Sequence, residues 1–367
     1  MNMAWTYSGH SVSLLQFVDE TNRQYDFIPT VYRTAPKQDP DTKCRTKTTD
    51  LPSIPRLSWV NQELTNWRWK RFLETEFDHT HDVLLTENIL GPSSIAVANR
   101  YDVPSIFFVR SILVLGLGVY DRNRGLVANY FHTDIGGKIQ FPFLYATSQR
   151  YATAMEAADV IVANSEFTAN CLSDQFNVET EIIYPPISLE EYQVPYNPGG
   201  KITMVNPRTK YKGADIFLDI AERLPEEEFL VAGSTNDPSI EQRIEELDNV
   251  TYLGWQDDMS HVYQQAKLVV VPSRIQEAFG RVAAEAMASG IPCVVSDRGG
   301  LPEVVGDLGQ TVTDIESVEA WVDAIQTALN EDSAADRSDR KQHVEKFSMD
   351  RQVTKLFDLI DAVVADE

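Results

Sequence analysis

The stretch KLVVVPSRIQEAFGRVAAEAMASGIPCVVSD, residues 267–297, decides the fold of this chain. It opens with an apolar run at 267–273, passes through a loop into small residues of helical length at 280–290, and closes with a second apolar run at 291–297. A strand, a helix and another strand in this order indicate two strands of one parallel sheet. Ligands of such sheets bind at the carboxyl ends of the strands. We therefore expect a binding site in the loop that follows residue 273.

The same alternation continues on both sides of this stretch, from Lys201 onward. We predict strands at 201–206, 227–234, 250–255, 267–273 and 291–297. We predict helices at 213–224, 239–248, 259–266, 280–290, 301–306, 317–331 and 350–364. Strands that alternate with helices predict an α/β fold with a doubly wound parallel sheet.

The first half is also α/β, but its pattern is less regular. We predict strands at 11–18, 81–88, 103–111, 159–165 and 179–187. We predict helices at 92–101, 149–158 and 166–176, and a long polar insertion at 116–141.

A run rich in proline and glycine, 184–201, separates the two halves and is the best candidate for a linker. A chain of 367 residues suits two domains. We predict an N-terminal domain at 1–186, a linker at 187–200, a C-terminal domain at 201–345 and a terminal helix at 346–367.

The chain is strongly acidic, with 55 Asp and Glu against 32 Lys and Arg and a net charge of −23. Nucleic acid is therefore not an expected partner, because neutralising phosphates requires a basic surface. The acid is spread over predicted helix faces such as 239–249, with few lysines. This pattern resembles proteins of salt-accumulating organisms, in particular halophilic archaea, in which salt screens self-repulsion. An ordinary acidic cytosolic protein is the alternative.

Targeting signals and cysteine spacing both favour a cytoplasmic protein. The sequence contains no apolar run of 18 or more residues and no secretion signal, so we expect no transmembrane segment. Its three cysteines, Cys44, Cys171 and Cys293, are far apart, which argues against a disulfide framework and against a zinc site.

The loop after residue 273 leads into a helix start with two glutamates near it. The unpaired N–H groups and the dipole of a helix that begins near Gly280 attract anions such as a diphosphate. Phe279 and Gly280 let the backbone approach a ligand closely, since glycine has no Cβ. Glu277 and Glu285 could then accept hydrogen bonds from hydroxyl pairs of one ligand. The alternative is that Glu277 caps the helix electrostatically and Glu285 is solvated.

A second strand-to-helix turn, VNPRTKYKGAD at 205–215, concentrates positive charge. Arg208, Lys210 and Lys212 precede a predicted helix start, where cations oppose the helix dipole unless an anion binds there. A diphosphate would supply that anion. Plain surface charge is the alternative interpretation.

Taken together, these segments resemble glycosyltransferase family 4, the retaining group 1 glycosyltransferases of GT-B architecture. The matching stretches are NPRTKYKG at 206–213, residues 269–305 and ANSEFTANCL at 163–172. Glu277 and Glu285 fall on the family's two glutamates, which have seven residues between them. The resemblance implies two Rossmann-like doubly wound domains that face each other across a cleft, with the terminal helix packed back toward the first domain.

The resemblance also implies a function and a set of roles. A sugar would move from a nucleotide-diphosphate donor to an acceptor with retention of configuration, without a metal or other cofactor. Arg208 and Lys212 would neutralise the leaving diphosphate, and Glu277 would contact the donor sugar. The remaining donor-side roles fall to the backbone near Phe279, Gly280 and Arg281, to Glu285 at the ribose, and to Ser234 and residues 271–274 at the base.

The N-terminal half departs from the family pattern. Family members open with a strand and a Gly-Gly loop, whereas residues 4–17 here read as the tail of a helix followed by the second strand. We therefore expect that the first strand and its glycine-rich loop are missing. The family often has a histidine after the strand that matches 103–111; Arg110 and Ser111 stand there. Arg110 is either an acceptor-side residue or a surface arginine.

Two other functions stay open at this point. One is a nucleotide-sugar epimerase or hydrolase of the same fold, and the other is an inactive, truncated homologue that binds nucleotide sugars. The acceptor is a glycan, a lipid or a small molecule. A lipid-linked acceptor would place the protein at the inner membrane face, but no basic amphipathic helix is evident in the sequence.

Overall fold

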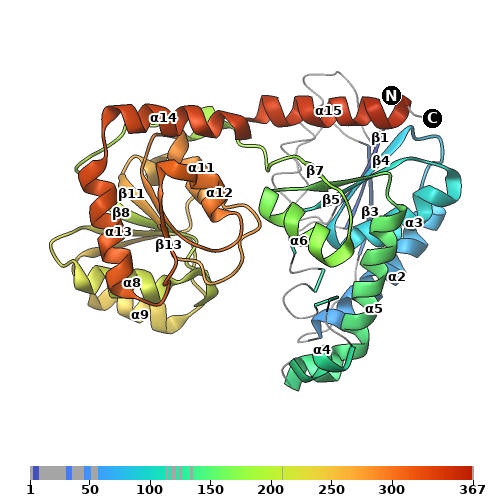
Figure 1. Ribbon diagram of the computed structural model, residues 1–367, viewed down its shortest axis with the longest axis horizontal. Helices are drawn as coiled ribbons and strands as arrows, with labels where there is room; N and C mark the ends of the chain where they lie inside the picture. The colour runs from blue at the N-terminus through green and yellow to red at the C-terminus, as the bar shows by residue number, and fades with distance from the viewer. Residues whose placement is uncertain are drawn as a thin grey trace. The chain divides into compact units, whose positions relative to one another are not determined.

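The structure, a computed structural model, describes residues 3–7, 30–34, 45–50, 57–112, 115–116, 121–123, 126–132, 135–208 and 210–365. The chain divides into two compact units. The first contains residues 1–184 and 352–367, and the second contains residues 185–351. Figure 1 follows the chain through both units.

Within the described residues, the first unit has a parallel sheet in the order β3-β2-β1-β4-β5-β6-β7. Its strands are β1 (Met3–Tyr7), β2 (Thr30–Thr34), β3 (Arg45–Thr49), β4 (Val83–Glu87), β5 (Ser105–Val109), β6 (Val160–Ala163) and β7 (Glu181–Ile182). Its helices are α2 (Ser58–Glu76), η1 (Asn88–Leu90), α3 (Gly91–Ala98), η2 (Asn99–Tyr101), α4 (Leu126–His132), α5 (Ile135–Ala157) and α6 (Glu166–Phe176).

Strand β1 corrects the prediction for the start of the chain. Met3–Tyr7 pairs with β2 on one side and β4 on the other, so it lies in the middle of the sheet. The prediction that residues 4–7 end a helix, and that the central strand is missing, is therefore wrong. The predicted strand at 11–18 and the position of the glycine-rich loop lie outside the described residues.

The structure also differs from the prediction of a polar insertion at 116–141. This segment contains α4 and the first two turns of α5, so the helix predicted to begin at 149 begins at Ile135. Helix α2 was not predicted at all. Its buried face carries Gln62, Thr65 and Asn66 beside Trp69 and Leu73, so the apolar periodicity that marks a helix is absent.

The second unit has a parallel sheet in the order β10-β9-β8-β11-β12-β13. Its strands are β8 (Lys201–Val205), β9 (Phe229–Ala232), β10 (Val250–Gly254), β11 (Ala266–Val271), β12 (Cys293–Ser296) and β13 (Gln310–Val312). Its helices are α7 (Leu189–Tyr192), η3 (Lys210–Lys212), α8 (Ala214–Arg223), α9 (Pro238–Glu246), α10 (Ser260–Tyr263), α11 (Arg281–Ala288), α12 (Leu301–Val305), η4 (Gly306–Leu308), α13 (Val318–Glu331), α14 (Ala334–Val344) and η5 (Glu345–Phe347).

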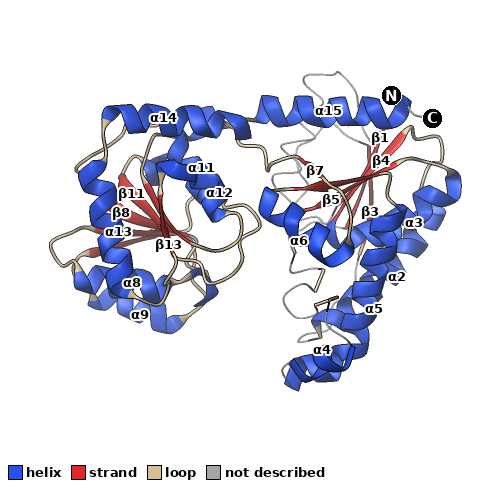
Figure 2. Cartoon of the chain, in the orientation of Figure 1, coloured by secondary structure: helices blue, strands red, loops and turns tan. Residues whose placement is uncertain are grey.

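Helices cover both faces of this second sheet, as Figure 2 shows. Helices α8, α9 and α13 bury one face in a cluster that includes Phe217, Phe229 and Trp321. Helix α11 packs on the other face against β11 and β12. Its run of alanines, Ala283, Ala284 and Ala286, is fully buried and allows this close approach.

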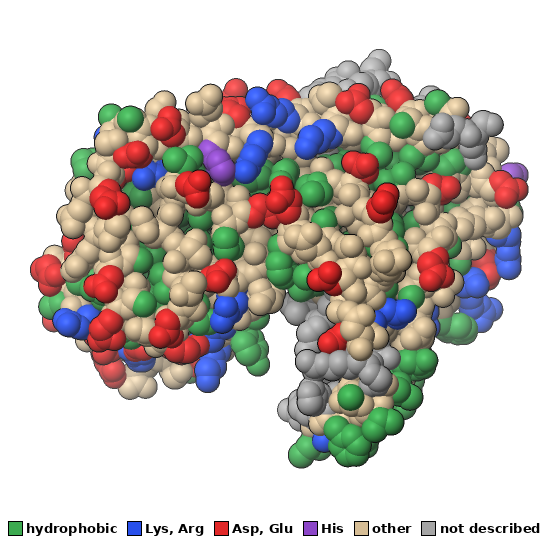
Figure 3. All heavy atoms as spheres, in the orientation of Figure 1, with side chains coloured by type: hydrophobic (Ala, Val, Ile, Leu, Met, Phe, Trp, Pro, Cys, Tyr) green, Lys and Arg blue, Asp and Glu red, His purple; other side chains and the backbone are tan. Residues whose placement is uncertain are grey.

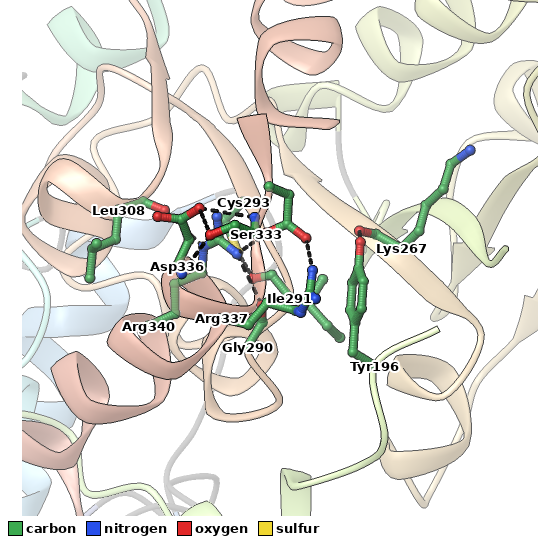
Figure 4. Close-up of polar contacts among 11 residues, drawn as sticks. Tyr196, Lys267, Gly290, Ile291, Cys293, Leu308, Ser333, Asp336, Arg337 and Arg340 are labelled. Carbon is green, nitrogen blue, oxygen red and sulfur yellow. Dashed lines mark hydrogen bonds and ion pairs between the residues drawn. The ribbon is translucent and has the colours of Figure 1, made fainter. Parts of the chain in front are cut away.

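A buried arginine joins α14 to the amino end of β12, and Figure 4 shows its contacts. Arg340 donates to the carbonyl oxygens of Leu308 and Gly290, at 3.0 and 3.1 Å, and pairs with Asp332 at 2.5 Å. Arg337 pairs with the other oxygen of Asp332. This cluster attaches α14 at the amino edge of the sheet, opposite the carboxyl edge where the candidate site lies.

The last helix, α15 (Met349–Ala365), begins in the second unit and continues in the first. It buries an apolar face made of Val353, Leu356, Phe357 and Ile360. Among the helices of the described residues, none is long and apolar enough to cross a membrane.

Candidate functional site

The candidate site lies where the strand order of the second sheet changes direction. Strands β8 and β11 are neighbours, and the chain continues from β8 to one side of the sheet and from β11 to the other. The crevice outside the carboxyl ends of two such strands is where ligands bind in doubly wound sheets. The two loops that meet there are the two stretches singled out in the sequence, 206–213 and 272–280.

Backbone contacts fix these two loops against each other. The N–H of Arg274 donates to the carbonyl oxygen of Tyr211 at 2.8 Å. Gly213 has a φ of 76°, and a Cβ on it would lie 1.9 Å from the carbonyl oxygen of Pro272. Only glycine fits this approach. The sequence pattern KG at 212–213 therefore sets how closely the basic loop meets the glutamate loop.

Glu277 and Lys212 form an ion pair across this junction. The Nζ of Lys212 lies 2.5 Å from Oε1 of Glu277, and the Oγ of Ser273 donates to the same oxygen at 2.8 Å. Within the described part of the chain, no hydrogen bond reaches Oε2 of Glu277. One oxygen is thus held and the other is available to a hydroxyl group of a ligand.

The loop after β12 holds the backbone of Glu277 in place. The N–H of Gly300 donates to the carbonyl oxygen of Glu277 at 2.7 Å, and the N–H of Gly299 donates to Oε1 of Gln276 at 2.5 Å. Gly299 has a φ of 65°, and a Cβ there would lie 2.0 Å from the Glu277 carbonyl oxygen. Gly299 and Gly300 therefore both act on the position of Glu277.

Helix α11 begins at the site, as the sequence predicts. Its N-cap residue Gly280 has a φ of 119°, and a Cβ there would lie 2.7 Å from Cδ2 of Leu301. The side chain of Phe279 is buried and packs edge-to-face on Phe347, with ring centroids 4.9 Å apart. Phe279 therefore anchors the loop by its side chain, and what it could offer a ligand is its backbone.

Glu285 is not the solvated carboxylate of the alternative interpretation. It is only 7% exposed, Tyr263 donates to its Oε2 at 2.9 Å, and Nε of Arg281 donates to its Oε1 at 3.2 Å. Burial raises the pKa of Glu285, although the charge of Arg281 and the bond from Tyr263 oppose that rise. Each oxygen can still accept a further bond, so the predicted ribose contact stays a prediction.

The other donor-side residues lie at the same edge of the sheet. Arg208 follows β8 and is exposed, and within the described residues it forms no ion pair. Ser234, also exposed, follows β9 next to β8. Arg281 donates from a terminal nitrogen to the carbonyl oxygen of Pro186 at 3.3 Å. The structure thus joins Lys212 to Glu277 and Arg281 to Glu285, while Arg208 and Ser234 have no recorded contact with either pair.

Arg274 lies in the segment predicted to contact the base of the donor, and its side chain forms ion pairs within the protein. It pairs with Glu316 at 2.6 and 2.8 Å and with Asp215 at 2.7 Å. The bonds to Glu316 and Asp215 raise the pKa of Arg274 above its usual range. Arg274 therefore fixes the loop after β11 to the start of α8.

Arg110, the acceptor-side candidate, lies in the first unit at the carboxyl end of β5. One of its terminal nitrogens is 3.4 Å from Oε2 of Glu87, which ends β4 and is 2% exposed. Its backbone N–H donates to Asn88, and Asn164 donates to its carbonyl oxygen. Arg110 is therefore a half-buried member of a polar cluster at the ends of β4, β5 and β6, which excludes an ordinary surface arginine.

Two residues of these clusters escaped the sequence analysis. Tyr263 lies in a short predicted helix and does not stand out by type or spacing. Glu87 ends a predicted strand, and its position at the carboxyl edge was the one available signal.

Known glycosyltransferases resemble this chain in sequence. Residues 201–331 match the family model described as "Glycosyl transferases group 1". The D-inositol 3-phosphate glycosyltransferase of Mycolicibacterium smegmatis is 28% identical over 242 residues, which cover 58% of this chain and 55% of the relative. The enzyme of the same name from Corynebacterium glutamicum is 39% identical over 110 residues, 29% of this chain and 26% of the relative. The chain spans about half the length of the first of these relatives.

Solved structures match over the full length of the chain. Sucrose-phosphate synthase from Thermosynechococcus elongatus has a TM-score of 0.78 at 18% identity and covers 100% of both chains. Alr3699/HepE from Anabaena, solved in complex with UDP and glucose, has a TM-score of 0.70 at 17% identity over 98% of this chain and 99% of its own.

These likenesses confirm the predicted fold class, two Rossmann-like units with parallel sheets. The chain therefore has the GT-B fold, and its residues 201–331 are similar to the group 1 glycosyl transferases.

Proposed function

We propose that this protein is a retaining glycosyltransferase of the hexosyltransferase type, which moves a sugar from a nucleoside-diphosphate sugar to an acceptor. The observation that carries the proposal is the state of Glu277, one carboxylate oxygen of which is held by Lys212 and Ser273. A fixed carboxylate with a second oxygen available is suited to orient the hydroxyl groups of a donor sugar. The family match over 201–331 supports the same class.

The donor diphosphate would lie between the basic loop and the start of α11. Lys212 pairs with Glu277, Arg208 is exposed in the same loop, and the N-terminal amides of α11 add partial positive charge. These charges would stabilise the leaving diphosphate as the glycosidic bond breaks. We propose that they do so without a metal ion, and activity should then be unchanged by a chelator.

UDP-sugars are the first donors to test. Solved structures of similar fold bind UDP, glucose or UDP-glucose, and residues 271–274 and Ser234 lie at the edge where a base would be held. The acceptor would bind at the carboxyl edge of the first sheet, where Arg110 and Glu87 form their ion pair. An arginine there suits an acceptor that carries phosphate or another anionic group.

The test is sugar transfer by the full chain, with donors labelled in the sugar and a panel of glycan, lipid and small-molecule acceptors. We expect label on an acceptor with the donor's anomeric configuration retained. Glu277→Gln should lower the transfer rate by about 100-fold, because it weakens the ion pair that fixes the sugar contact. Glu245→Gln, an exposed glutamate on α9, should transfer at the wild-type rate.

Two outcomes would contradict the proposal. One is a full transfer rate in Glu277→Gln. The other is product analysis in which the label is found only in an epimerised donor or in free sugar, which would assign the site to an epimerase or a hydrolase.

A further inference from the structure

The first unit carries a large exposed apolar surface, which we call the apolar cap. The cap is formed by eight side chains of α4 and the first half of α5: Leu126, Val127, Tyr130, Phe131, Ile135, Ile139, Phe143 and Tyr145. Their exposed fractions run from 39% for Phe143 to 80% for Ile135. Single exposed apolar residues are ordinary, but a contiguous group of this kind marks an interaction surface. Figure 3 shows hydrophobic side chains gathered where α4 and α5 begin.

The cap is a packed part of the unit, held from beneath. Tyr130 of α4 packs edge-to-face on Phe141 of α5, with ring centroids 5.3 Å apart. Phe141 and Leu144 are buried on the inner face of α5 together with Trp59. Helix α5 is therefore apolar on its inner face and again on its outer face, where Ile135, Ile139 and Phe143 follow at intervals of four residues. A helix that is apolar all round requires a partner on each side.

A cation borders the cap, although the chain as a whole carries −23. The Nζ of Lys138 lies 6.0 Å from the ring centroid of Tyr130. Arg122, which precedes α4 in the chain, instead contacts Ser148 and the ring of Phe176. A lysine beside exposed aliphatic and aromatic side chains is typical of an interfacial membrane surface.

We propose that the apolar cap binds the surface of an anionic lipid bilayer. The apolar side chains would enter the boundary between headgroups and acyl chains, and Lys138 would contact anionic headgroups. The negative charge elsewhere would repel such a bilayer, so the cap is the part of the described surface suited to approach it. A second copy of the chain is a poorer occupant, because two molecules of −23 repel each other.

The experiment is flotation of the full chain with two kinds of vesicles, one of pure phosphatidylcholine and one that also contains phosphatidylglycerol. We expect the wild type to float with the anionic vesicles and much less with the neutral ones. The double variant Ile135→Ser/Ile139→Ser should lower the partition coefficient by about tenfold or more, because two exposed isoleucines no longer enter the bilayer. Trp255→Ser, which removes a large exposed side chain of the second unit, should float as the wild type does.

Three outcomes would overturn the proposal. The first is that the wild type floats with neither kind of vesicle, and the second is that the double variant floats as well as the wild type. The third is a stable dimer, seen by light scattering without lipid, that the double variant breaks. UDP binding by the double variant, measured alongside, should equal that of the wild type, since the candidate donor site lies in the second unit. A change in flotation alone thus separates this surface from the proposed transferase activity.

Discussion

Two glutamates in one short segment have opposite environments. Glu277 has an oxygen without a bond from the described residues, whereas both oxygens of Glu285 are bonded and its side chain is almost fully buried. Spacing in the sequence pairs these residues but cannot separate their roles. The difference comes from Tyr263 and from α7, which packs on α11, and neither carries a signal in the sequence around the glutamates.

The burial of Glu285 predicts a pH-dependent effect on stability. Burial raises the pKa of Glu285, so over the interval above the unfolded-state pKa the folded state binds more protons than the unfolded state. The stability contribution of this carboxyl is therefore present at low pH and is lost as pH rises through the raised pKa. Glu285→Gln lacks that loss. Relative to the wild type, its free energy of unfolding should increase as pH rises from about 4, near the unfolded-state pKa of a glutamate, toward neutral pH.

Urea denaturation of both proteins across this pH range makes the measurement. The Glu245→Gln variant serves as the control, because the exposed glutamate should give a difference from wild type that is nearly constant with pH. A constant difference for Glu285→Gln as well would show that its carboxyl behaves as an ordinary solvated one.

At the scale of elements, apolar periodicity located most helices and strands of the second unit to within two or three residues. It failed for α2, which buries polar side chains, and for α4 with the start of α5, which exposes apolar ones. In α2, hydrogen bonds such as that from Ser93 to Asn66 allow polar side chains to be buried. In α4 and the start of α5, the proposed membrane surface accounts for the exposed apolar side chains.

Helix α14 also escaped prediction, and its attachment is testable. Arg340 is buried on this helix and donates to two carbonyl oxygens as well as to Asp332. Arg340→Leu should lower the free energy of unfolding by about 3–5 kcal/mol, because it leaves buried acceptors without a donor. Lys341→Leu on the same helix, at an exposed position, should change it by less than about 0.5 kcal/mol. Equal effects in the two variants would contradict a structural role for the arginine cluster.

At the scale of the molecule, the order of strands decides where chemistry can occur. Both sheets change direction beside their first strand, β1 in one unit and β8 in the other. The sequence predicted the second of these sheets and its site loops, because strong alternation of strands and helices begins at Lys201. It missed the first strand of the first sheet, because five residues, MAWTY, are too few to show a period.

The net charge of −23 predicts a stabilising effect of salt. Adding KCl screens repulsion among the acidic residues, and the Debye length falls from about 10 Å at 0.1 M to about 3 Å at 1 M. We expect the Tm to rise over this range, measured by circular dichroism. Sorbitol at matched osmolality should raise the Tm less, since it leaves the charges unscreened. A Tm that stays constant or falls with KCl would contradict the claim that repulsion among the acidic residues destabilises the fold.

The central claim is that the junction of β8 and β11 binds a nucleoside diphosphate through Lys212. The most direct measurement is calorimetric titration of the full chain with UDP, GDP and ADP in turn. At least one of them should bind the wild type, and its Kd should rise by about tenfold or more in Lys212→Gln, which removes a charge-assisted contact. Lys341→Gln, at an exposed position of α14, should bind like the wild type. Binding of none of the three, or equal affinity in all three proteins, would contradict the claim.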